Sequence, residues 1–258
     1  MNTSRELYPE ERQQDILRVI SQDGRAAVAD LSRKYSVSEV TIRGDLQALA
    51  DQGLIVRTHG GAVTVPQSGD LSLSLRRQQQ MLEKERIGSA ASSFVADGDA
   101  IFLDTSSTSL AIVRHLKQYR ELTVLTNSLA IAQAVLDMNG VTLVMTGGVL
   151  RRDTASLIGI DGLNVLGKFN IKSGFFGAHG LTLAEGLTDV SVGEAEVKSQ
   201  VVRMCHQVIA VLDATKWGRV GPSSFARVAD LSVIVTDQSA PNDLMEQVRV
   251  HGTRVVQV

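Results

Sequence analysis

The second half of the chain alternates short apolar runs with segments that have helical spacing, and this pattern constrains the fold most. We predict strands over residues 100–104, 122–126, 141–145, 172–177, 207–213, 231–236 and 253–258. Helices are predicted between them, over residues 109–118, 129–138 and 193–204. Strands joined through helices lie parallel, so we predict an α/β domain with a doubly wound, mostly parallel sheet.

The first 65 residues show a different pattern, typical of a small helical unit. Helices are predicted from about residue 12 to 23, from 28 to 35, and up to about Gln52, with Gly53 as the stop. Ser36 and Ser38 are candidate caps of the third helix, with Glu39 three residues after Ser36. A strand-like run over 54–59 and the turn at 60–61 follow. The order predicts a winged helix-turn-helix.

The third helix carries the functional signal of this unit. Its apolar stripe is formed by Ile42, Leu46 and Leu49. Helical geometry turns four other side chains away from the stripe, namely Thr41, Arg43, Gly44 and Gln47. Such side chains fit a DNA major groove. The alternative is a three-helix bundle that only docks on the rest of the protein.

Charge limits how this unit can hold DNA. The whole chain carries a formal charge of −2, and residues 1–65 hold eight Lys or Arg against nine Asp or Glu. A single protomer therefore offers little general attraction for phosphates. We expect specific binding to need a few residues around Arg43 and the pairing of such units in an oligomer.

The segment after the wing divides the chain. Residues 64–70 contain Pro66 and Gly69 without periodicity, and a long helix is predicted over 74–94. The domain prediction is therefore a DNA-binding domain over 1–65, a linker over 66–80, and an α/β domain over 81–258.

Polar loops follow the predicted strands, where parallel sheets bind ligands. The first loop is Asp104-Thr105-Ser106-Ser107-Thr108, directly before a helix. Hydroxyls and backbone N–H groups at that position favour an oxyanion or phosphate, although plain helix capping accounts for one of the hydroxyl residues. The loop predicts an anion site.

Further candidates for the same ligand site follow the other strands. They are Thr126, Asn127, Ser128, Gly147, Gly148, Gly177, His179, Glu194, Lys198 and Lys216. The charged candidates and the histidine have plainer alternatives: His179 as a loop histidine, Glu194, Glu196 and Lys198 as a solvated helix face, and Lys216 as an exposed loop lysine. Together they favour a small, polar, negatively charged ligand.

Several chemistries have no motif in the sequence. No Gly-x-Gly-x-x-Gly follows the first strand, no Walker-type Gly-Lys-Ser/Thr occurs, and no cluster of His and Cys offers a metal site. We therefore expect no cofactor, no metal and no catalytic residues. One cysteine, an N-terminus without an apolar core and the lack of any apolar run of about 18 residues predict a cytoplasmic protein without a membrane anchor.

From about residue 11 to 237 the chain resembles the DeoR family of bacterial sugar-metabolism repressors. The most specific match runs over residues 37–46, with Leu49, Gly53-Leu54 and residues 57–62. The second half is similar to the family's sensor domain through Glu83–Ile87, Asp97–Asp99, Asp104–Thr108, Thr126–Ser128 and Asp213–Lys216.

The resemblance implies a repressor of a carbohydrate-utilisation operon, dimeric or tetrameric, whose effector is a phosphorylated sugar. It implies a sensor fold related to ribose-5-phosphate isomerase and the CoA transferases. By that analogy Asp104–Thr108 would hold the phosphate, and Asn127, Glu194, Lys198 and Lys216 would line the sugar pocket. Ser38, Thr41 and Arg43 would then reach bases or phosphates, with Arg57 and His59 on the DNA backbone.

Two positions depart from the family pattern. Gly44 stands where the family usually has an arginine, which removes one cation and weakens the helix by up to about 1 kcal/mol. Ser106 stands where the anion loop usually has glycine, so the loop conformation and the ligand preference are expected to differ.

Two other functions remain as alternatives. The first is a sugar-phosphate isomerase with Glu194 or Glu196 as general base, against which we expect no paired carboxylates near the Gly177–Gly180 turn. The second is a DNA-binding domain fused to a purely structural oligomerisation domain.

Overall fold

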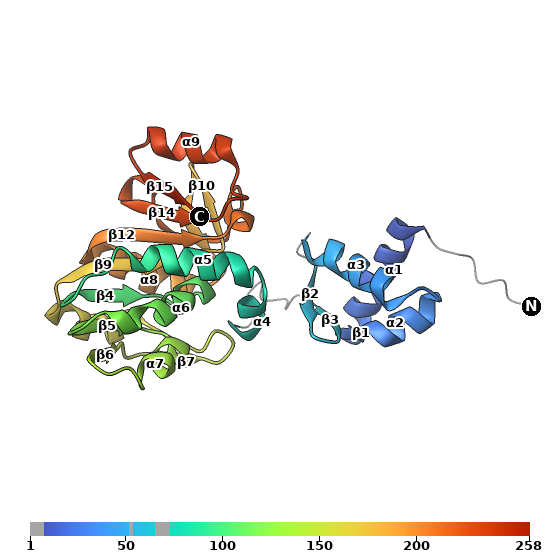
Figure 1. Ribbon diagram of the computed structural model, residues 1–258, viewed down its shortest axis with the longest axis horizontal. Coiled ribbons are helices and arrows are strands. Elements are labelled where there is room, and N and C mark those ends of the chain that lie inside the picture. The colour runs from blue at the N-terminus through green and yellow to red at the C-terminus, as the bar shows by residue number, and fades with distance from the viewer. Residues whose placement is uncertain (1–7, 52–53, 65–72) are drawn as a thin grey trace, which may run out of the picture. The chain divides into compact units, whose positions relative to one another are not determined.

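The chain divides into two compact units, residues 1–71 (unit 1) and 72–258 (unit 2). The structure is a computed structural model that describes residues 8–51, 54–64 and 73–258 (Figure 1). Within these residues, no helix has both the length and the apolar character needed to cross a membrane.

Unit 1 has the predicted three helices and hairpin. Its elements are α1 (Pro9–Asp23), β1 (Arg25–Ala27), α2 (Val28–Tyr35), α3 (Glu39–Asp51), β2 (Ile55–Thr58) and β3 (Gly61–Thr64). The strands form an antiparallel sheet in the order β1-β3-β2. Ile42, Leu46 and Leu49 are buried as predicted, against Ile16 and Ile20 of α1. β1 was not predicted, because three residues are too few to show alternation.

The predicted capping of α3 is only half right. Ser36 has a φ of 54° and ends α2 in the left-handed conformation. The cap of α3 is Ser38, whose Oγ accepts a hydrogen bond from the Thr41 backbone N–H at 3.1 Å. The capping box from Ser36 to Glu39 is therefore wrong. The predicted helix end at Gln52 and the stop at Gly53 lie outside the described residues.

Unit 2 is built on a seven-stranded parallel sheet, which confirms the predicted fold class. Its strands are β4 (Ala100–Leu103), β5 (Leu122–Thr126), β6 (Val141–Met145), β9 (Ile171–Phe176), β12 (Cys205–Leu212), β14 (Val233–Thr236) and β15 (Arg254–Gln257). Their order is β15-β14-β12-β9-β4-β5-β6, with every neighbouring pair parallel.

Helices cover both faces of this sheet (Figure 1). The residues of β4 alternate between two cores, with Ile101 and Leu103 in one and Phe102 in the other. The first core is closed by α5 (Met81–Ser92), α6 (Ser107–Ile112), η1 (Val113–Gln118) and α7 (Leu129–Val135). The second is closed by η2 (Ile160–Lys168), α8 (Val192–Met204) and α9 (Asn242–Val250).

Two predicted helices differ from the structure. The long helix over 74–94 is wrong: α4 (Leu73–Gln78) ends, and α5 begins after Gln80, which has a φ of 49°. The helix over 109–118 begins earlier, at Ser107, and continues as 3-10 helix from Val113. Of the predicted linker over 66–80, residues 66–72 lie outside the described residues, and 73–78 form α4.

Short antiparallel strands at the carboxyl edge of the sheet were not predicted. One pair is β7 (Val149–Arg151) with β8 (Ser156–Ile158). A second sheet joins β10 (Gly180–Thr182), β11 (Gly186–Asp189) and β13 (Ser223–Ala226). The 3-10 turn η3 (Ala214–Lys216) follows β12 at this edge, whereas η4 (Val228–Asp230) precedes β14. The second sheet matters for the site, because β11 ends on Asp189.

Candidate functional site

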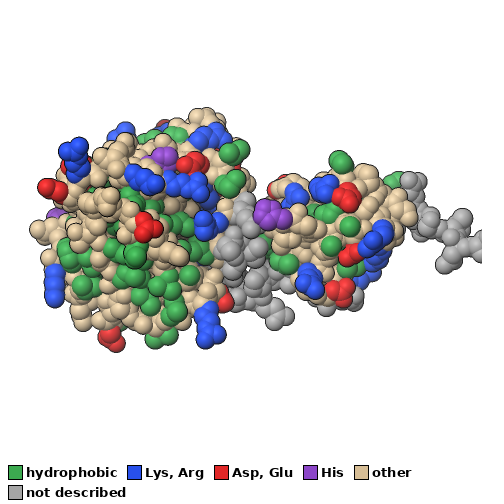
Figure 2. Space-filling view, turned by 60° about the horizontal axis from the view of Figure 1, so that its bottom comes forward, with side chains coloured by type: hydrophobic (Ala, Val, Ile, Leu, Met, Phe, Trp, Pro, Cys, Tyr) green, Lys and Arg blue, Asp and Glu red, His purple; other side chains and the backbone are tan. Residues whose placement is uncertain are grey.

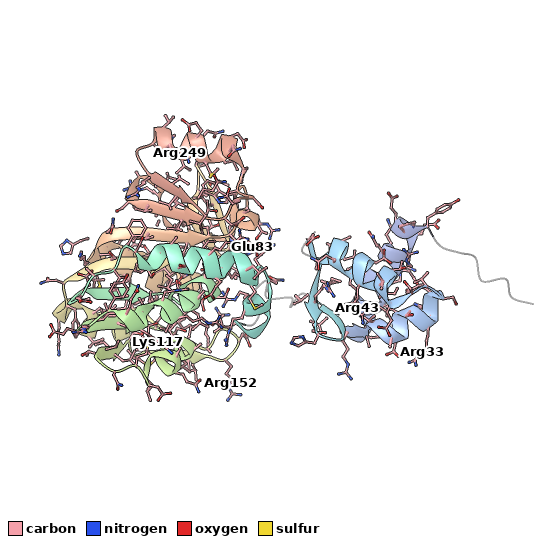
Figure 3. The ribbon with its side chains drawn as sticks, in the orientation of Figure 1. Arg33, Arg43, Glu83, Lys117, Arg152 and Arg249 are labelled. Carbon is pink, nitrogen blue, oxygen red and sulfur yellow. The ribbon has the colours of Figure 1, made fainter. Side chains whose placement is uncertain are left out.

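The face of α3 opposite its apolar stripe is exposed. Arg43, Gly44 and Gln47 are exposed and Thr41 is half-buried, so the outward orientation predicted for this set is confirmed. The Ser38 and Thr41 hydroxyls lie 2.8 Å apart and hydrogen-bond to each other. Figure 3 shows Arg43 among the side chains of unit 1. Polar groups of several kinds thus share one helix face.

Two arginines of unit 1, one on α3 and one on β2, are held by neighbouring side chains. Arg43 Nη2 lies 2.6 Å from Glu39 Oε2, one helical turn earlier. Arg57 on β2 donates from Nη1 to Gln47 Oε1 at 2.7 Å, which ties the hairpin to α3. Its Nε is buried without a hydrogen-bond partner among the described residues. Each contact orients a guanidinium group and uses one of its N–H donors.

The remaining DNA-binding candidates lie at the ends of elements. Ser36 is exposed in the turn between α2 and α3. His59 is exposed in the tip that joins β2 to β3. Neither makes a side-chain hydrogen bond within the described residues.

Replacing Gly44 by arginine should strengthen DNA binding and stabilise unit 1. A Cβ added at Gly44 meets nothing within 4 Å, so a longer side chain fits the exposed face. Removing glycine from a helix interior contributes about 1 kcal/mol, and one new phosphate contact steepens the salt dependence by about one unit. Gly44→Ala is the matched control, because it should reproduce the stabilisation without the change in salt slope, measured by fluorescence anisotropy. Equal slopes for the two variants would rule out a phosphate near this position.

One charged residue of α3 points into unit 1. Asp45 is buried and accepts hydrogen bonds from Arg12 of α1, from Nε at 2.6 Å and from Nη2 at 3.2 Å. Gln13 donates to the same carboxylate at 3.1 Å. This ion pair fixes α3 against α1, and sequence reasoning missed it because the two residues are far apart in the chain.

In unit 2, three buried charges meet at the carboxyl ends of the strands. Lys198 Nζ of α8 lies 2.9 Å from Asp104 Oδ2 and 2.7 Å from Asp189 Oδ2. Asp104 follows β4 and Asp189 ends β11, so three elements supply the cluster. The alternative reading of Lys198 and Glu194 as a solvated face is wrong, because both are buried, whereas Glu196 is exposed as that reading required.

Gly177 joins this cluster through its backbone. Its N–H donates to Asp104 Oδ2 at 3.0 Å, and its carbonyl accepts from Lys198 Nζ at 2.9 Å. A Cβ at Gly177 would lie 2.4 Å from the Ser106 Cβ, so only glycine allows this approach. The expectation of no paired carboxylates at this turn is therefore wrong, because Asp104 and Asp189 meet beside it through Lys198.

The charges of this cluster stabilise one another. Burial by itself would lower the pKa of Lys198, but the carboxylates of Asp104 and Asp189 outweigh it and raise that pKa above its usual value. Burial opposes ionisation of Asp189, yet the charge of Lys198 keeps the Asp189 pKa below its usual value. Lys198 and Asp189 are therefore both charged at neutral pH.

Glu194 extends the cluster along α8. It accepts a hydrogen bond from Ser156 Oγ at 2.8 Å and lies 3.8 Å from Arg151 Nη1. Ser156 belongs to β8 and Arg151 to β7, so this hairpin is bound to the first turn of α8.

In the predicted anion loop, some side chains make hydrogen bonds within the protein and others do not. Ser106 caps α6 by accepting from the Ser109 N–H at 3.0 Å, and Ser109 Oγ donates to Asp104 at 2.6 Å. The hydroxyls of Thr105, Ser107 and Thr108 make no hydrogen bond with any described residue. These three hydroxyls remain available to a ligand, whereas that of Ser106 serves capping.

The polar side chains of the loop after β5 form hydrogen bonds with the backbone of the protein. Thr126 Oγ1 donates to the Leu103 carbonyl at 2.7 Å, and Asn127 Nδ2 donates to the Leu157 carbonyl at 3.0 Å. Ser128 caps α7 by accepting from the Ile131 N–H at 3.3 Å. The contacts of this loop are therefore those of a structural turn.

The glycines after β6 pack against the chain's own backbone. Gly147 donates from its N–H to the Gly162 carbonyl at 3.0 Å. A Cβ on Gly148 would lie 2.2 Å from the Ile158 carbonyl oxygen. β6 is an edge strand, two positions from β4 in the sheet. The structure does not bring these glycines into the cluster around Lys198.

His179 follows β9, and Lys216 ends the turn η3 after β12. Both are half-buried. Burial, followed by the charge of Lys216, lowers the pKa of His179, so its imidazole is neutral at neutral pH. Burial is the largest cause that lowers the pKa of Lys216. The carboxylate of Asp213 opposes this effect, and the charges of Arg219 and Arg76 add to it. Lys216 is thus not the freely exposed loop lysine of the plainer reading.

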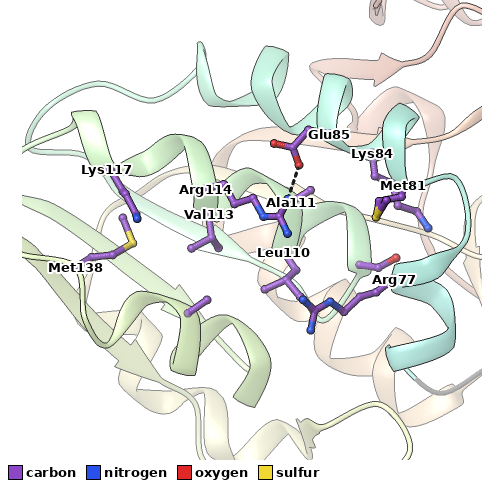
Figure 4. A pocket seen from close by; sticks show the side chains of 12 residues that line it. Arg77, Met81, Lys84, Glu85, Leu110, Ala111, Val113, Arg114, Lys117 and Met138 are labelled. Carbon is purple, nitrogen blue, oxygen red and sulfur yellow. Dashed lines mark hydrogen bonds and ion pairs between the residues drawn. The ribbon is translucent and has the colours of Figure 1, made fainter.

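A separate groove of about 530 Å³ opens between α5, α6, η1 and α7 (Figure 4). Its cations are Arg77, Lys84, Arg114 and Lys117. Arg114 is paired with Glu85 at 3.1 Å. Ser107 also lines the groove, which connects it to the start of α6. Among the described residues, no group of three or more His, Cys, Asp or Glu side chains could hold a metal ion.

Two family models match the chain. The DeoR-like helix-turn-helix domain matches residues 12–68, and the DeoR C-terminal sensor domain matches residues 79–238. Together they span both units.

Curated relatives match over nearly their whole length. The HTH-type transcriptional regulator GolR of Listeria innocua is 32% identical, over 96% of this chain and 98% of its own. The putative aga operon transcriptional repressor of Escherichia coli O157:H7 is 31% identical, over 96% and 93%. The glycerol-3-phosphate regulon repressor of Escherichia coli K12 is 28% identical, over 93% and 96%.

Similarity to solved structures is much weaker. Ribose 5-phosphate isomerase A from Methanocaldococcus jannaschii aligns with 17% identity and a TM-score of 0.39, over 52% of this chain and 53% of its own. The eIF2B delta chain from Chaetomium thermophilum aligns with 13% identity and a TM-score of 0.42, over 81% and 65%. These scores are too low to bear on function.

Proposed function

The chain belongs to the DeoR family of transcriptional regulators, and from that premise we propose that it represses a carbohydrate-utilisation operon under the control of a phosphorylated sugar. Unit 1 would bind the operator and unit 2 the sugar phosphate. The observation that carries the proposal is the charged cluster of unit 2, buried where a parallel sheet binds its ligands.

The DNA-binding half of the proposal places α3 in the major groove. Ser38, Thr41, Arg43 and Gln47 would face bases or phosphates, with Gly44 allowing close approach. Arg57, His59 and Ser36 would contact the DNA backbone. The exposed polar face and the buried apolar stripe of α3 support this orientation.

The sensing half places the sugar phosphate over the ends of β4 and β9. The uncommitted hydroxyls of Thr105, Ser107 and Thr108 would meet its phosphate. Lys216 and His179 would face it from the neighbouring loops, while Asp104, Glu194, Lys198 and Gly177 hold the site in shape. Asn127 and Thr126 would support the loop beside it. A ligand that favours one arrangement of the protein shifts its DNA affinity.

We further propose a dimer or tetramer that acts in the cytoplasm, where its operator is. Figure 2 shows hydrophobic side chains gathered on one face of unit 2. The exposed large hydrophobic residues include Leu136, Val149 and Ile160. Exposed apolar surface of this kind favours association, and pairing compensates for the low positive charge of one DNA-binding unit.

A thermal-shift screen of the full chain tests the sensing half. Aldose, ketose and polyol phosphates are compared with the same sugars without phosphate. A ligand present at a hundred times its Kd should stabilise the protein by about 2.7 kcal/mol, a shift of several degrees. Stabilisation by the phosphorylated members alone is the expected result. No shift with any compound would favour a purely structural unit 2.

A second candidate function is a sugar-phosphate isomerase. It is favoured by one observation, the two carboxylates Asp104 and Asp189 beside Gly177. Against it, Lys198 binds both carboxylates, which leaves neither free as a general base. Incubating the protein with the same aldose and ketose phosphates decides the matter, because measurable interconversion would favour the enzyme.

A further inference from the structure

Arg76 on α4 has buried donors that no described residue uses. Its Nε and Nη2 are buried and have no hydrogen-bond partner among the described residues. A guanidinium carries five N–H donors, and each buried donor left unpaired costs about 1–3 kcal/mol. Such a group favours the binding of an acceptor beyond those that the described residues provide.

Two lysines lie near this guanidinium. Lys84 Nζ donates to the backbone carbonyls of Arg76 and Gln79, at 2.7 Å each, so it lies against the end of α4. Burial lowers the pKa of Lys84 to about 8, and repulsion from Lys216 and Arg76 adds to this effect against the attraction of Asp213. Burial lowers the pKa of Lys216 most, and the charge of Arg76 adds to this effect. We call Arg76, Lys84 and Lys216 the cation cluster.

The nearby acids are engaged elsewhere. Asp189 is bound to Lys198, and Asp213 accepts from the Thr215 N–H at 3.1 Å and from the Thr215 hydroxyl. Within the described residues, no ion pair joins an acid to any member of the cation cluster. Positive charge is therefore in local excess at this end of the sheet, which favours an anionic ligand.

The cation cluster lies beside the open hydroxyls of the anion loop. α4 packs against α6, whose first turn begins at Ser107. Lys84 and Ser107 line the same groove. An anion bound by Arg76 would therefore lie near the side-chain hydroxyls of Ser107 and Thr108, which make no hydrogen bond with a described residue.

We propose that Arg76 is a direct ligand of the effector's phosphate group, which it binds from α4 together with Lys84 and Lys216. A guanidinium binds a phosphate through two parallel N–H···O hydrogen bonds, which would use the two unpartnered nitrogens. This inference rests on the proposed function. Arg76 lies on α4, outside the segments through which the chain resembles the family's sensor domain.

The position of α4 gives this contact a consequence for regulation. α4 is the first described element of unit 2 after the boundary at residues 71 and 72. Its start is held by a hydrogen bond from the Leu73 N–H to the Asp153 carbonyl at 3.1 Å. Phosphate on Arg76 would fix the other end, so occupancy bears directly on the segment that leads to the DNA-binding unit.

The test is phosphate binding by the full-length chain, with sodium phosphate as the probe and sodium chloride at equal ionic strength as the blank. Arg76→Gln should weaken phosphate binding about tenfold or more, because it removes charge-assisted hydrogen bonds. Arg76→Lys should retain part of the affinity. Arg77→Gln is the matched control: it removes the neighbouring arginine, which is exposed and lines the groove instead. It should bind phosphate like the wild type.

Thermal stability without phosphate separates binding from a structural role. Because the buried donors of Arg76 are unpaired, Arg76→Gln should leave the Tm unchanged or raise it. A lower Tm would mean that Arg76 serves the fold, and would overturn the proposal. Loss of phosphate binding in Arg77→Gln but not in Arg76→Gln would also overturn it and place the anion in the groove.

The sugar-phosphate screen distinguishes failure of this inference from failure of the proposed function. If wild type and Arg76→Gln respond equally to the same sugar phosphate, Arg76 is not a ligand and the sensing function stands. If the wild type responds neither to phosphate nor to any sugar phosphate, both proposals fail.

Discussion

Replacing Lys198 by methionine is expected to lower the free energy of unfolding of unit 2 by about 3–5 kcal/mol. The substitution keeps an unbranched apolar chain but removes the ammonium group, which leaves Asp104 and Asp189 without their shared counter-charge in a buried site. Their mutual repulsion and lost solvation are then uncompensated. Urea unfolding followed by the fluorescence of Trp217, the one tryptophan of the chain and buried in unit 2, measures the loss.

An exposed ion pair provides the control for this experiment. Lys172 lies 2.9 Å from Asp99, and its side chain is 54% exposed. Lys172→Met should therefore cost less than about 1 kcal/mol. Adding Asp189→Asn to Lys198→Met should recover part of the stability, because one of the two opposed charges disappears. Equal losses for Lys198→Met and Lys172→Met would show that the buried cluster does not stabilise the fold as described.

Replacing Arg43 by alanine is expected to weaken operator binding about tenfold to a hundredfold, the range of one good arginine contact to a base. The duplex is one that the wild-type protein selects from a random library. Because Arg43 is exposed and, among the described residues, is paired only with Glu39, its removal should leave the Tm and the effector-induced thermal shift unchanged. Fluorescence anisotropy at fixed salt measures the affinity.

Arg33 supplies the matched control for Arg43, since both are exposed arginines of unit 1 paired with an acid on their own helix (Figure 3). Arg33→Ala should weaken binding to selected and random duplexes alike, whereas Arg43→Ala should reduce the preference for the selected one. If Arg43→Ala keeps the wild-type preference, α3 does not read the bases through this residue.

Local patterns predicted most of the architecture. In β4, Ile101, Phe102 and Leu103 pack alternately into the two cores, and such buried runs are visible in the sequence. The stripe of Ile42, Leu46 and Leu49 is equally local. The break at Gln80 was missed, because a run of glutamines favours helix by propensity, and the left-handed turn there depends on tertiary packing.

The charged interior of the site could be predicted only in part. Asp104 was predicted from its place after a strand and Lys198 from its place near a helix start, but their meeting depends on how α8 packs beside the end of β4. Asp189 was missed because it arrives on β11, a short strand of the second sheet. Asp45 and Arg76 were missed because nothing in the local sequence distinguishes a buried charge from an exposed one.

The central claim is that a sugar phosphate bound by unit 2 controls DNA binding by unit 1. Its most direct test is the affinity for the selected duplex, measured by anisotropy with and without the sugar phosphate that stabilises the protein most. The account predicts a change in Kd of at least about fivefold, within the usual range of allosteric coupling, and no change with the unphosphorylated sugar. An unchanged Kd at saturating sugar phosphate would contradict it.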